Sequence, residues 1–187
     1  MGVVYAPQEN KTNIPELKVM YKGLKEQIRQ ARMKKQEVLL VGDFNCKVGS
    51  RINRNTKEIS KGGKLLIDLA DKHGLKILNE SSVCKGLWTR EKKVLNHTEK
   101  SVLDYVLIDE QDEELVESMI IDEEREFTPY HIEDGQHTYS DHKTIQLDIK
   151  WNMRHKPGEG MRTCITCLLY TSPSPRDLST SRMPSSA

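Results

Sequence analysis

The chain has 187 residues, of which 30% are charged, 36% hydrophobic and 5% aromatic. This composition favours one folded domain over a disordered chain, and no apolar stretch is long enough to span a bilayer. Lys and Arg number 29 against 28 Asp and Glu, which excludes a globally basic nucleic-acid binder, so any nucleic-acid contact must be local.

The first third of the chain predicts a strand and a long helix. A short β-rich run at residues 3–6 is stopped by Pro7 and is typical of a strand that enters a loop. Apolar residues at helical spacing, with start signals at Asn13 and Pro15, predict an amphipathic helix over residues 14–35. We interpret its basic residues as a solvated face, with a stripe that faces nucleic acid as the alternative.

The next segments alternate between strand and helix. The continuous apolar run at residues 38–41 is typical of a strand buried on both faces, and it ends abruptly at Gly42-Asp43-Phe44-Asn45. Apolar residues within 65–70 predict a second helix with Gly74 as its C-terminal cap, and residues 75–78 predict another strand.

The second half of the chain predicts two more strands, over residues 102–108 and 144–151. Between them, residues 109–126 carry ten acidic residues and one arginine. Because charge runs usually face water, we interpret this segment as a solvated acidic loop or helix.

The last residues form a separate compositional class. Residues 167–187 are rich in Ser, Pro, Thr and Arg, and their codons can be written as a transposase-type sequencing adapter on both sides of a short index at residues 178–180. We therefore expect a domain over residues 1–152, a short linker over 153–166 and a disordered, artefactual tail. The Cys164/Cys167 pair then straddles an artificial junction, and the four cysteines suit a reducing, intracellular location.

Polar residues capable of chemistry stand where the predicted strands end. The i, i+2 spacing of Asp43 and Asn45 lets both side chains point the same way from an extended segment. A carboxylate beside an amide suits the holding of a water molecule and a phosphate oxygen. An Asx-turn after a strand is the alternative.

A second pair of segments supplies an acid and an imidazole. Asp104 interrupts an apolar strand, and a buried aspartate needs a partner such as His142. His142 can accept a proton or, when charged, stabilise an oxyanion if a carboxylate fixes its ring. An ordinary surface loop is the alternative for Asp141-His142 taken alone.

In this order, the segments VVYAPQ, LLVGDFN, LWT, SVLDYVLI and YSDH resemble the endonuclease/exonuclease/phosphatase superfamily, whose fold is that of deoxyribonuclease I. They look most like apurinic-type endonuclease domains of non-LTR retrotransposons. The resemblance runs from about residue 3 to residue 149 and depends on the joint order of the motifs. It implies an α/β protein, a four-layer α/β/β/α sandwich incomplete at its N-terminus, that hydrolyses phosphodiester bonds of DNA with Mg²⁺, or alternatively Mn²⁺.

The resemblance also implies roles for individual residues. Asp43 would orient or deprotonate the attacking water, and Asn45 would hold the scissile phosphate. His142, with its ring fixed by Asp104, would contact the same phosphate, as would Tyr5.

Three further residues follow from the same motifs. Asp141 would support a metal or the leaving group, so that Asp43 and Asp141 are the expected metal ligands. Trp88 and Thr89 match a structural tryptophan-threonine segment and are expected to support the site.

One departure from the family pattern leads to a further expectation. The family's first strands, with an Asn and the Glu that is its principal metal ligand, lie before the strand that here follows Met1-Gly2. We therefore expect that an upstream segment is missing and that this polypeptide is inactive and only marginally stable, with exposed strand edges.

Two alternatives to a DNA endonuclease remain open. One is a non-catalytic retroelement remnant or interaction module that keeps the fold. The other, a phosphoinositide or sphingolipid phosphoesterase of the same superfamily, is disfavoured by the lack of apolar membrane-facing loops. DNA is the expected partner and no membrane is expected, and the location would be nuclear if the parent is a retroelement.

Overall fold

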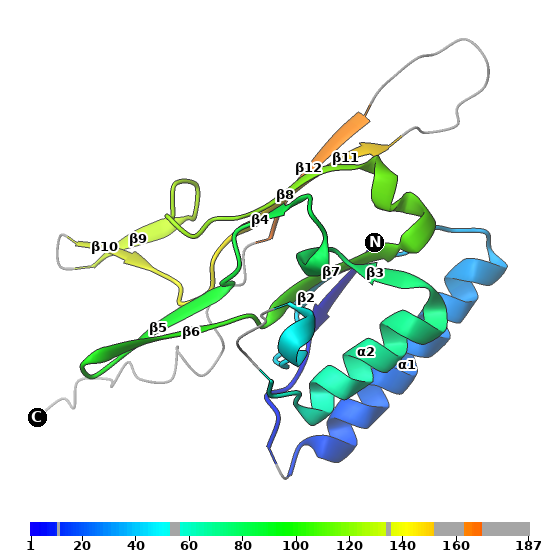
Figure 1. Cartoon of the computed structure of the whole chain (residues 1–187), viewed down its shortest axis with the longest axis horizontal. Coiled ribbons are helices and arrows are strands. Elements are labelled where there is room, and N and C mark those ends of the chain that lie inside the picture. Colours follow the sequence, from blue (N-terminus) through cyan, green and yellow to red (C-terminus); the bar gives the residue numbers. More distant parts are fainter. Residues whose placement is uncertain (11, 53–56, 134–135, 152–162, 170–187) are drawn as a thin grey trace, which may run out of the picture.

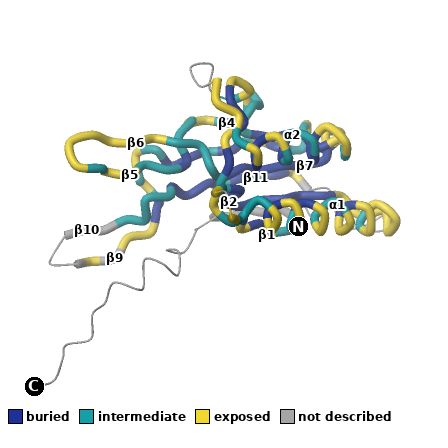
Figure 2. The backbone as a smooth tube through the Cα atoms, turned by 90° about the horizontal axis from the view of Figure 1, so that it is seen from below, coloured by how far each residue is buried: buried dark blue, intermediate teal, exposed yellow. Residues whose placement is uncertain are grey.

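The computed structural model describes residues 1–10, 12–52, 57–133, 136–151 and 163–169. Two β-sheets pack face to face, and two helices cover the outer face of one of them (Figure 1). Figure 2 shows that the buried backbone is concentrated in these sheets, whereas the outer turns of the helices and the β5–β6 hairpin are exposed.

The first sheet has the strand order β1-β2-β7-β3. β1 runs parallel to β2, whereas β7 is antiparallel to both of its neighbours. The four strands are β1 (Gly2–Tyr5), β2 (Leu39–Asp43), β3 (Leu75–Ile77) and β7 (Asp104–Asp109).

Helices α1 (Ile14–Met33) and α2 (Lys61–His73) cover this sheet. Leu17, Tyr21 and Ile28 of α1 are buried in the core between helices and sheet. Ser60 caps α2, since its hydroxyl accepts the Gly63 amide at 3.0 Å. Gly74 ends this helix with φ of 58°, a left-handed conformation that glycine adopts readily.

The second sheet has the order β12-β11-β8-β4 and packs against the other face of the first. The core between the sheets includes Val41 of β2, Val106 of β7, Met119 of β8 and Leu147 of β11. The strands are β4 (Cys84–Lys85), β8 (Val116–Ile121), β11 (Ile145–Trp151) and β12 (Thr163–Leu169).

Two hairpins and three short 3₁₀ helices complete the described elements. The β5–β6 hairpin extends away from the two helices (Figure 1). The bounds are β5 (Arg90–Val94), β6 (His97–Ser101), β9 (Tyr130–Glu133), β10 (Gln136–Tyr139), η1 (Gly49–Arg51), η2 (Leu78–Glu80) and η3 (Glu110–Leu115).

The predicted α/β class is confirmed, and every helix and strand expected from the apolar patterns is present to within a few residues. β2 is buried on both faces, as its continuous apolar run predicts. Of the four layers expected, the described residues form three, because both long helices lie on the same side of the sandwich. None of these helices is long and apolar enough to cross a membrane.

The interpretation of residues 109–126 as a solvated acidic loop or helix suits η3 but is wrong for the residues that follow it. β8 runs through the middle of this segment, and its Val116, Met119 and Ile121 are buried between the sheets. The strand is hard to recognise in the sequence because acidic residues flank its apolar side chains, which face one way. At the start of the segment, Asp109 is itself buried, where it accepts the Val38 amide at 2.7 Å and pairs with Arg32.

Residues 163–169 differ from the expected linker and disordered tail. They form β12, which pairs antiparallel with β11 from Ile145↔Leu169 to Trp151↔Thr163. A run of β-branched and apolar residues suits an edge strand, and β11 would otherwise leave its hydrogen-bonding edge unpaired. The remaining tail, residues 170–187, lies outside the described residues, and its adapter origin stays a prediction.

The edge strand β1 exposes apolar side chains. Val3 is the register partner of Val41, so both side chains project from the same face of the sheet. Val41 is fully buried between the sheets, whereas Val3 is 73% exposed. The second sheet therefore does not cover β1 in the part of the chain that the structure describes.

Candidate active site

Three candidate residues form a row across the first sheet. Tyr5 is the register partner of Asp43, and Asp43 is the register partner of Asp104. Partners on adjacent strands project from the same face, so strands far apart in sequence present a phenol and two carboxylates side by side. Tyr5 is 61% exposed, whereas both carboxylates are buried.

His142 completes the row from the segment that precedes β11. Its Nδ1 lies 2.9 Å from Oδ2 and 3.2 Å from Oδ1 of Asp104. The expected pairing of this buried aspartate with His142 is therefore present. The contact through Nδ1 fixes the imidazole ring and leaves its Nε2 atom for other contacts.

Asn45 lies directly against Asp43. Its backbone amide donates to Asp43 Oδ1 at 2.8 Å, and its Nδ2 donates to Asp43 Oδ2 at 2.9 Å and to the Ala6 carbonyl at 2.8 Å. This is a turn closed by the aspartate side chain, with Asn45 at φ of 46°. Both the Asx-turn and the juxtaposition of carboxylate and amide are therefore present in one structure.

Burial and neighbouring charge shift the acidities of the site. Burial, followed by the charge of Asp104, raises the pKa of Asp43 to about 6, against the opposing effect of His142. Burial opposes protonation of His142, but the hydrogen bond to Asp104 and the charges of Asp104 and Asp43 outweigh it and raise the pKa of His142. Asp43 is thus mostly ionised at neutral pH, and His142 holds its proton more readily than a free imidazole.

Asp141 is held by a residue that the sequence did not single out. Arg90 Nε and Nη2 each lie 2.7 Å from Asp141 Oδ2. Two charge-assisted contacts of this kind hold the carboxylate in one orientation and neutralise it. Asp141, expected to support a metal or leaving group, is thus already paired with a guanidinium.

The backbone joins the same two segments. Arg90 and His142 form an isolated antiparallel bridge, with the Glu91 amide donating to the Asp141 carbonyl and the Lys143 amide to the Thr89 carbonyl, each at 2.8 Å. This short ladder places His142 opposite the strand that follows Trp88-Thr89. The pairing joins residues about fifty positions apart, so no local pattern in the sequence signals it.

Lys143 strengthens this ladder from inside the protein. Its side chain is only 1% exposed, and its ammonium group lies 2.9 Å from Glu91 Oε2 and 2.8 Å from the Glu123 carbonyl. Glu123 in turn accepts the amides of Leu87 and Trp88, each at 2.8 Å. In the sequence, only the position of this lysine directly after a candidate catalytic histidine points to a contact of Lys143 near the site.

The two residues expected to support the site lie beside it. The buried Thr89 hydroxyl accepts the amides of Leu103 and Asp104 at 2.9 and 3.1 Å, which fixes the start of β7. Trp88 is half-buried and faces a recess next to β6. The Thr89 side chain therefore contacts the backbone of Asp104 directly. Trp88 is connected to the site only as the residue that precedes Thr89.

A cleft of about 630 Å³ adjoins the row of candidate residues. Asn45, Arg90 and Leu103 line it, together with charged residues of both signs. Its size is within the usual range for ligand sites in proteins.

The described residues contain no cluster of three His, Cys, Asp or Glu side chains that could hold a metal ion. Mg²⁺ often binds through one or two carboxylates, with water and substrate phosphate in the remaining positions. Of the two carboxylates expected as metal ligands, Asp43 and Asp141, the second is neutralised by Arg90.

The chain matches the family model for endonuclease-reverse transcriptase over residues 1–146. Because this is most of the chain, the protein belongs to this family, within the endonuclease/exonuclease/phosphatase superfamily. Its structure is similar to the endonuclease domain of TRAS1, a telomere-specific non-LTR retrotransposon, with 22% identity and a TM-score of 0.49. The match covers 70% of this chain and 52% of that one, so the chain spans about half of that domain's length. No curated protein matches the chain.

Proposed function

We propose that the chain carries the phosphate-handling part of a DNA endonuclease site. The observation that carries this proposal is the row of Asp43, Asp104 and His142 beside a cleft, in a member of the endonuclease-reverse transcriptase family. A buried carboxylate can take a proton from water, and an imidazole whose pKa is raised can stabilise negative charge on phosphate oxygens, which are two tasks of phosphodiester hydrolysis.

The chain's own residues divide the chemistry between them. With a pKa of about 6, Asp43 is ionised at neutral pH and can take the proton of a water molecule as that water attacks phosphorus. His142, whose pKa is raised, can in its protonated form donate a hydrogen bond to the phosphate oxygens as they become more negative. Asp104 orients the imidazole and stabilises its charged form.

Tyr5 and Asn45 would position the substrate. Tyr5 is exposed at the end of the row and can donate its hydroxyl to a phosphate oxygen. Both Nδ2 hydrogens of Asn45 are already engaged by Asp43 and Ala6, so Asn45 would contact the phosphate only after releasing one of them.

We propose Mg²⁺ as the cofactor, with Asp43 and Asp141 as its ligands and Mn²⁺ as a substitute. When bound, such an ion would neutralise charge on the phosphate. Since the described residues bring no third metal-binding side chain to the site, we propose that the 187-residue chain binds the ion weakly and cleaves DNA poorly or not at all by itself.

The test combines DNA binding with cleavage. The purified chain is incubated with supercoiled plasmid and Mg²⁺, next to its Asp43→Ala and His142→Ala variants. We expect retarded DNA on a gel with little or no nicking. Nicking that disappears with Asp43→Ala would confirm the proposed chemistry but overturn the proposed inactivity of the chain. Absence of any DNA binding would overturn the proposal that DNA is the substrate.

Two other functions are compatible with family membership. A non-catalytic remnant would bind DNA equally well in the wild type and the His142→Ala variant. A lipid phosphoesterase would instead sediment with phosphoinositide vesicles, which we do not expect, because the exposed apolar residues of β1 line no part of the cleft.

A further inference from the structure

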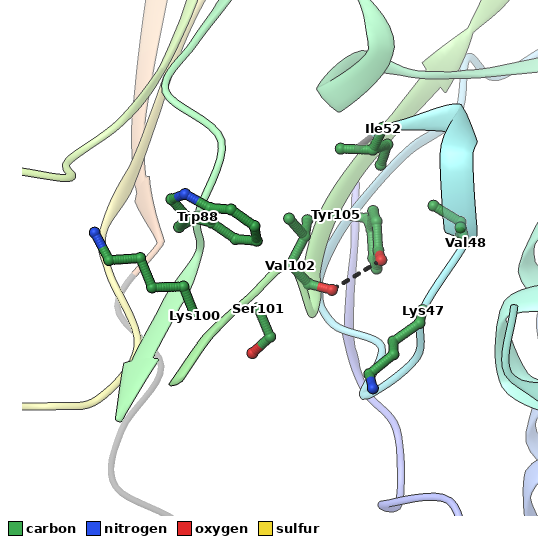
Figure 3. Close-up of a pocket in the computed structure, with 9 residues that line it drawn as sticks. Lys47, Val48, Ile52, Trp88, Lys100, Ser101, Val102 and Tyr105 are labelled. Atoms are coloured by element: carbon green, nitrogen blue, oxygen red, sulfur yellow. Dashed lines mark hydrogen bonds between the residues drawn. The ribbon is translucent and has the colours of Figure 1, made fainter. Parts of the chain in front are cut away.

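A small recess lies next to the proposed DNA cleft. It measures about 150 Å³ and is enclosed by Trp88, Val102 and Tyr105 with Val48 and Ile52 (Figure 3). Trp88 comes from the segment before β5 and Val102 from the turn between β6 and β7, whereas Val48 and Ile52 flank η1. Three elements that are distant in sequence therefore build one apolar site.

The walls of the recess are apolar even where polar atoms are near. The Tyr105 hydroxyl donates at 2.9 Å to the Cys46 carbonyl and lies 3.0 Å from the Val102 carbonyl. The hydroxyl is thus engaged by the backbone, and the buried Tyr105 side chain forms the floor of the recess. The backbone of Trp88 is held in place because its amide donates to the Glu123 carboxylate at 2.8 Å.

Two basic side chains line the recess. They are Lys47 and Lys100, and among the described residues no acidic side chain lines it. Each ammonium group has an acidic partner outside the recess, Glu58 at 2.8 Å and Glu91 at 3.8 Å. Such exposed pairs contribute little, so a phosphate can replace either partner at low cost.

The recess is continuous with the proposed cleft. Lys47, Lys100 and Ser101 line both spaces, and the cleft also contains Asn45 and Arg90 of the candidate site. A strand of DNA in the cleft would therefore pass the mouth of the recess.

We propose that the recess binds one unpaired nucleobase of the DNA strand that occupies the cleft, with Trp88 as a stacking partner and Lys47 and Lys100 as contacts to the adjacent phosphates. This inference rests on the proposed function. A nucleobase has the flat apolar faces that the recess requires, and aromatic stacking with basic flanks is how proteins hold single-stranded nucleic acid. A base pair is too wide for a space of this size, so the base enters alone.

The fluorescence of Trp88 tests this directly. The chain has two tryptophans, so a Trp151→Phe background leaves Trp88 as the reporter. Single-stranded oligonucleotide is expected to quench its emission, whereas polyphosphate, which has the charges without the bases, is not. Unchanged emission at oligonucleotide concentrations that saturate binding by anisotropy would overturn the inference and leave the proposed function intact.

Binding affinities supply a second, independent readout. Trp88→Leu is expected to weaken binding of the oligonucleotide roughly 5- to 100-fold, the range for loss of one stacked base. Lys100→Ala should lower the salt dependence of binding by about 0.7 for the lost phosphate contact. Lys92→Ala, which removes an equally exposed charge from the same hairpin but lines no recess, is the control.

The outcomes separate the two proposals even if Trp88→Leu fails to fold, because quenching and Lys100→Ala do not depend on that variant. Equal effects of Lys100→Ala and Lys92→Ala on the salt dependence of binding would indicate general charge attraction. They would overturn the proposal that the recess binds a nucleobase. Absence of all oligonucleotide binding by the folded wild-type chain would overturn both proposals.

Discussion

The Nδ1 atom of His142 lies 2.9 Å from the Oδ2 atom of Asp104, and these residues come from the segment before β11 and the first position of β7. The two sheets thus meet at this contact: β7 belongs to the first sheet and β11 to the second. The proposed chemistry depends on this junction, because the hydrogen bond to Asp104 and the charge of Asp104 raise the pKa of the neighbouring imidazole.

Removal of that carboxylate charge should change the titration of His142. In Asp104→Asn the carboxylate charge that raises the pKa of His142 is lost and the hydrogen bond can form only with a neutral amide oxygen, while burial and the charges of Asp43 and Asp141 stay. We expect the pKa of His142 to fall below its value in the wild-type chain, as followed by NMR of the imidazole signals against pH. An unchanged titration curve would show that Asp104 does not control the imidazole.

Asp43→Asn should stabilise the protein at alkaline pH. The pKa of Asp43 is about 6 in the folded state and near 4 when unfolded, so folding takes up a proton between these values and stability falls as pH rises through this window. The substitution removes that loss, and we expect a gain of about 1 kcal/mol at pH 8, reduced because the new amide meets the Asn45 donor.

The measurement is urea unfolding of both proteins at pH 8 and pH 4. The gain should shrink below pH 6 and become small near pH 4, where Asp43 is protonated in the folded state and about half protonated in the unfolded chain. A difference between the two proteins that does not vary with pH would contradict the assigned titration.

Lys143→Met should loosen the segment that carries His142. It leaves Glu91 without its buried partner and the Glu123 carbonyl without a donor, which costs about 2–3 kcal/mol of unfolding free energy. Lys92→Met on exposed β5 is the matched control and should change stability by less than about 0.5 kcal/mol. If the double variant Glu91→Gln/Lys143→Met loses as much unfolding free energy as the two single variants added together, the pair is not coupled.

The two register partners Val3 and Val41 should respond very differently to truncation. Val41→Ala removes buried methyl groups between the sheets and should cost about 2 kcal/mol, whereas Val3→Ala at the exposed edge should cost less than about 0.5 kcal/mol. Thermal unfolding of the two variants measures this. Equal losses would mean that another part of the chain or a second molecule covers β1.

The sequence predicted those parts of the fold whose signals are local. The apolar run before Gly42-Asp43 identified β2 because a strand buried on both faces needs no alternation. Gly74 marked the end of α2, since the left-handed conformation there suits glycine. β8 was missed because its buried apolar positions lie within a run of acidic residues.

The contacts of the candidate site residues were predictable only in part. The pairing of Asp104 with His142 followed from the need of a buried aspartate for a partner. The contacts of Arg90 with Asp141 and of Lys143 with Glu91 were not predicted, because they join segments about fifty residues apart and depend on the ladder between them. No property of one segment alone specifies such a ladder.

The most direct test of the central claim is an NMR titration of the His142 imidazole with a phosphorothioate oligonucleotide that resists cleavage. A phosphodiester that contacts this imidazole should shift its signals in step with binding, while the imidazoles of His73 and the exposed His97 stay unchanged. Saturation of DNA binding with no movement of the His142 signals would contradict the account.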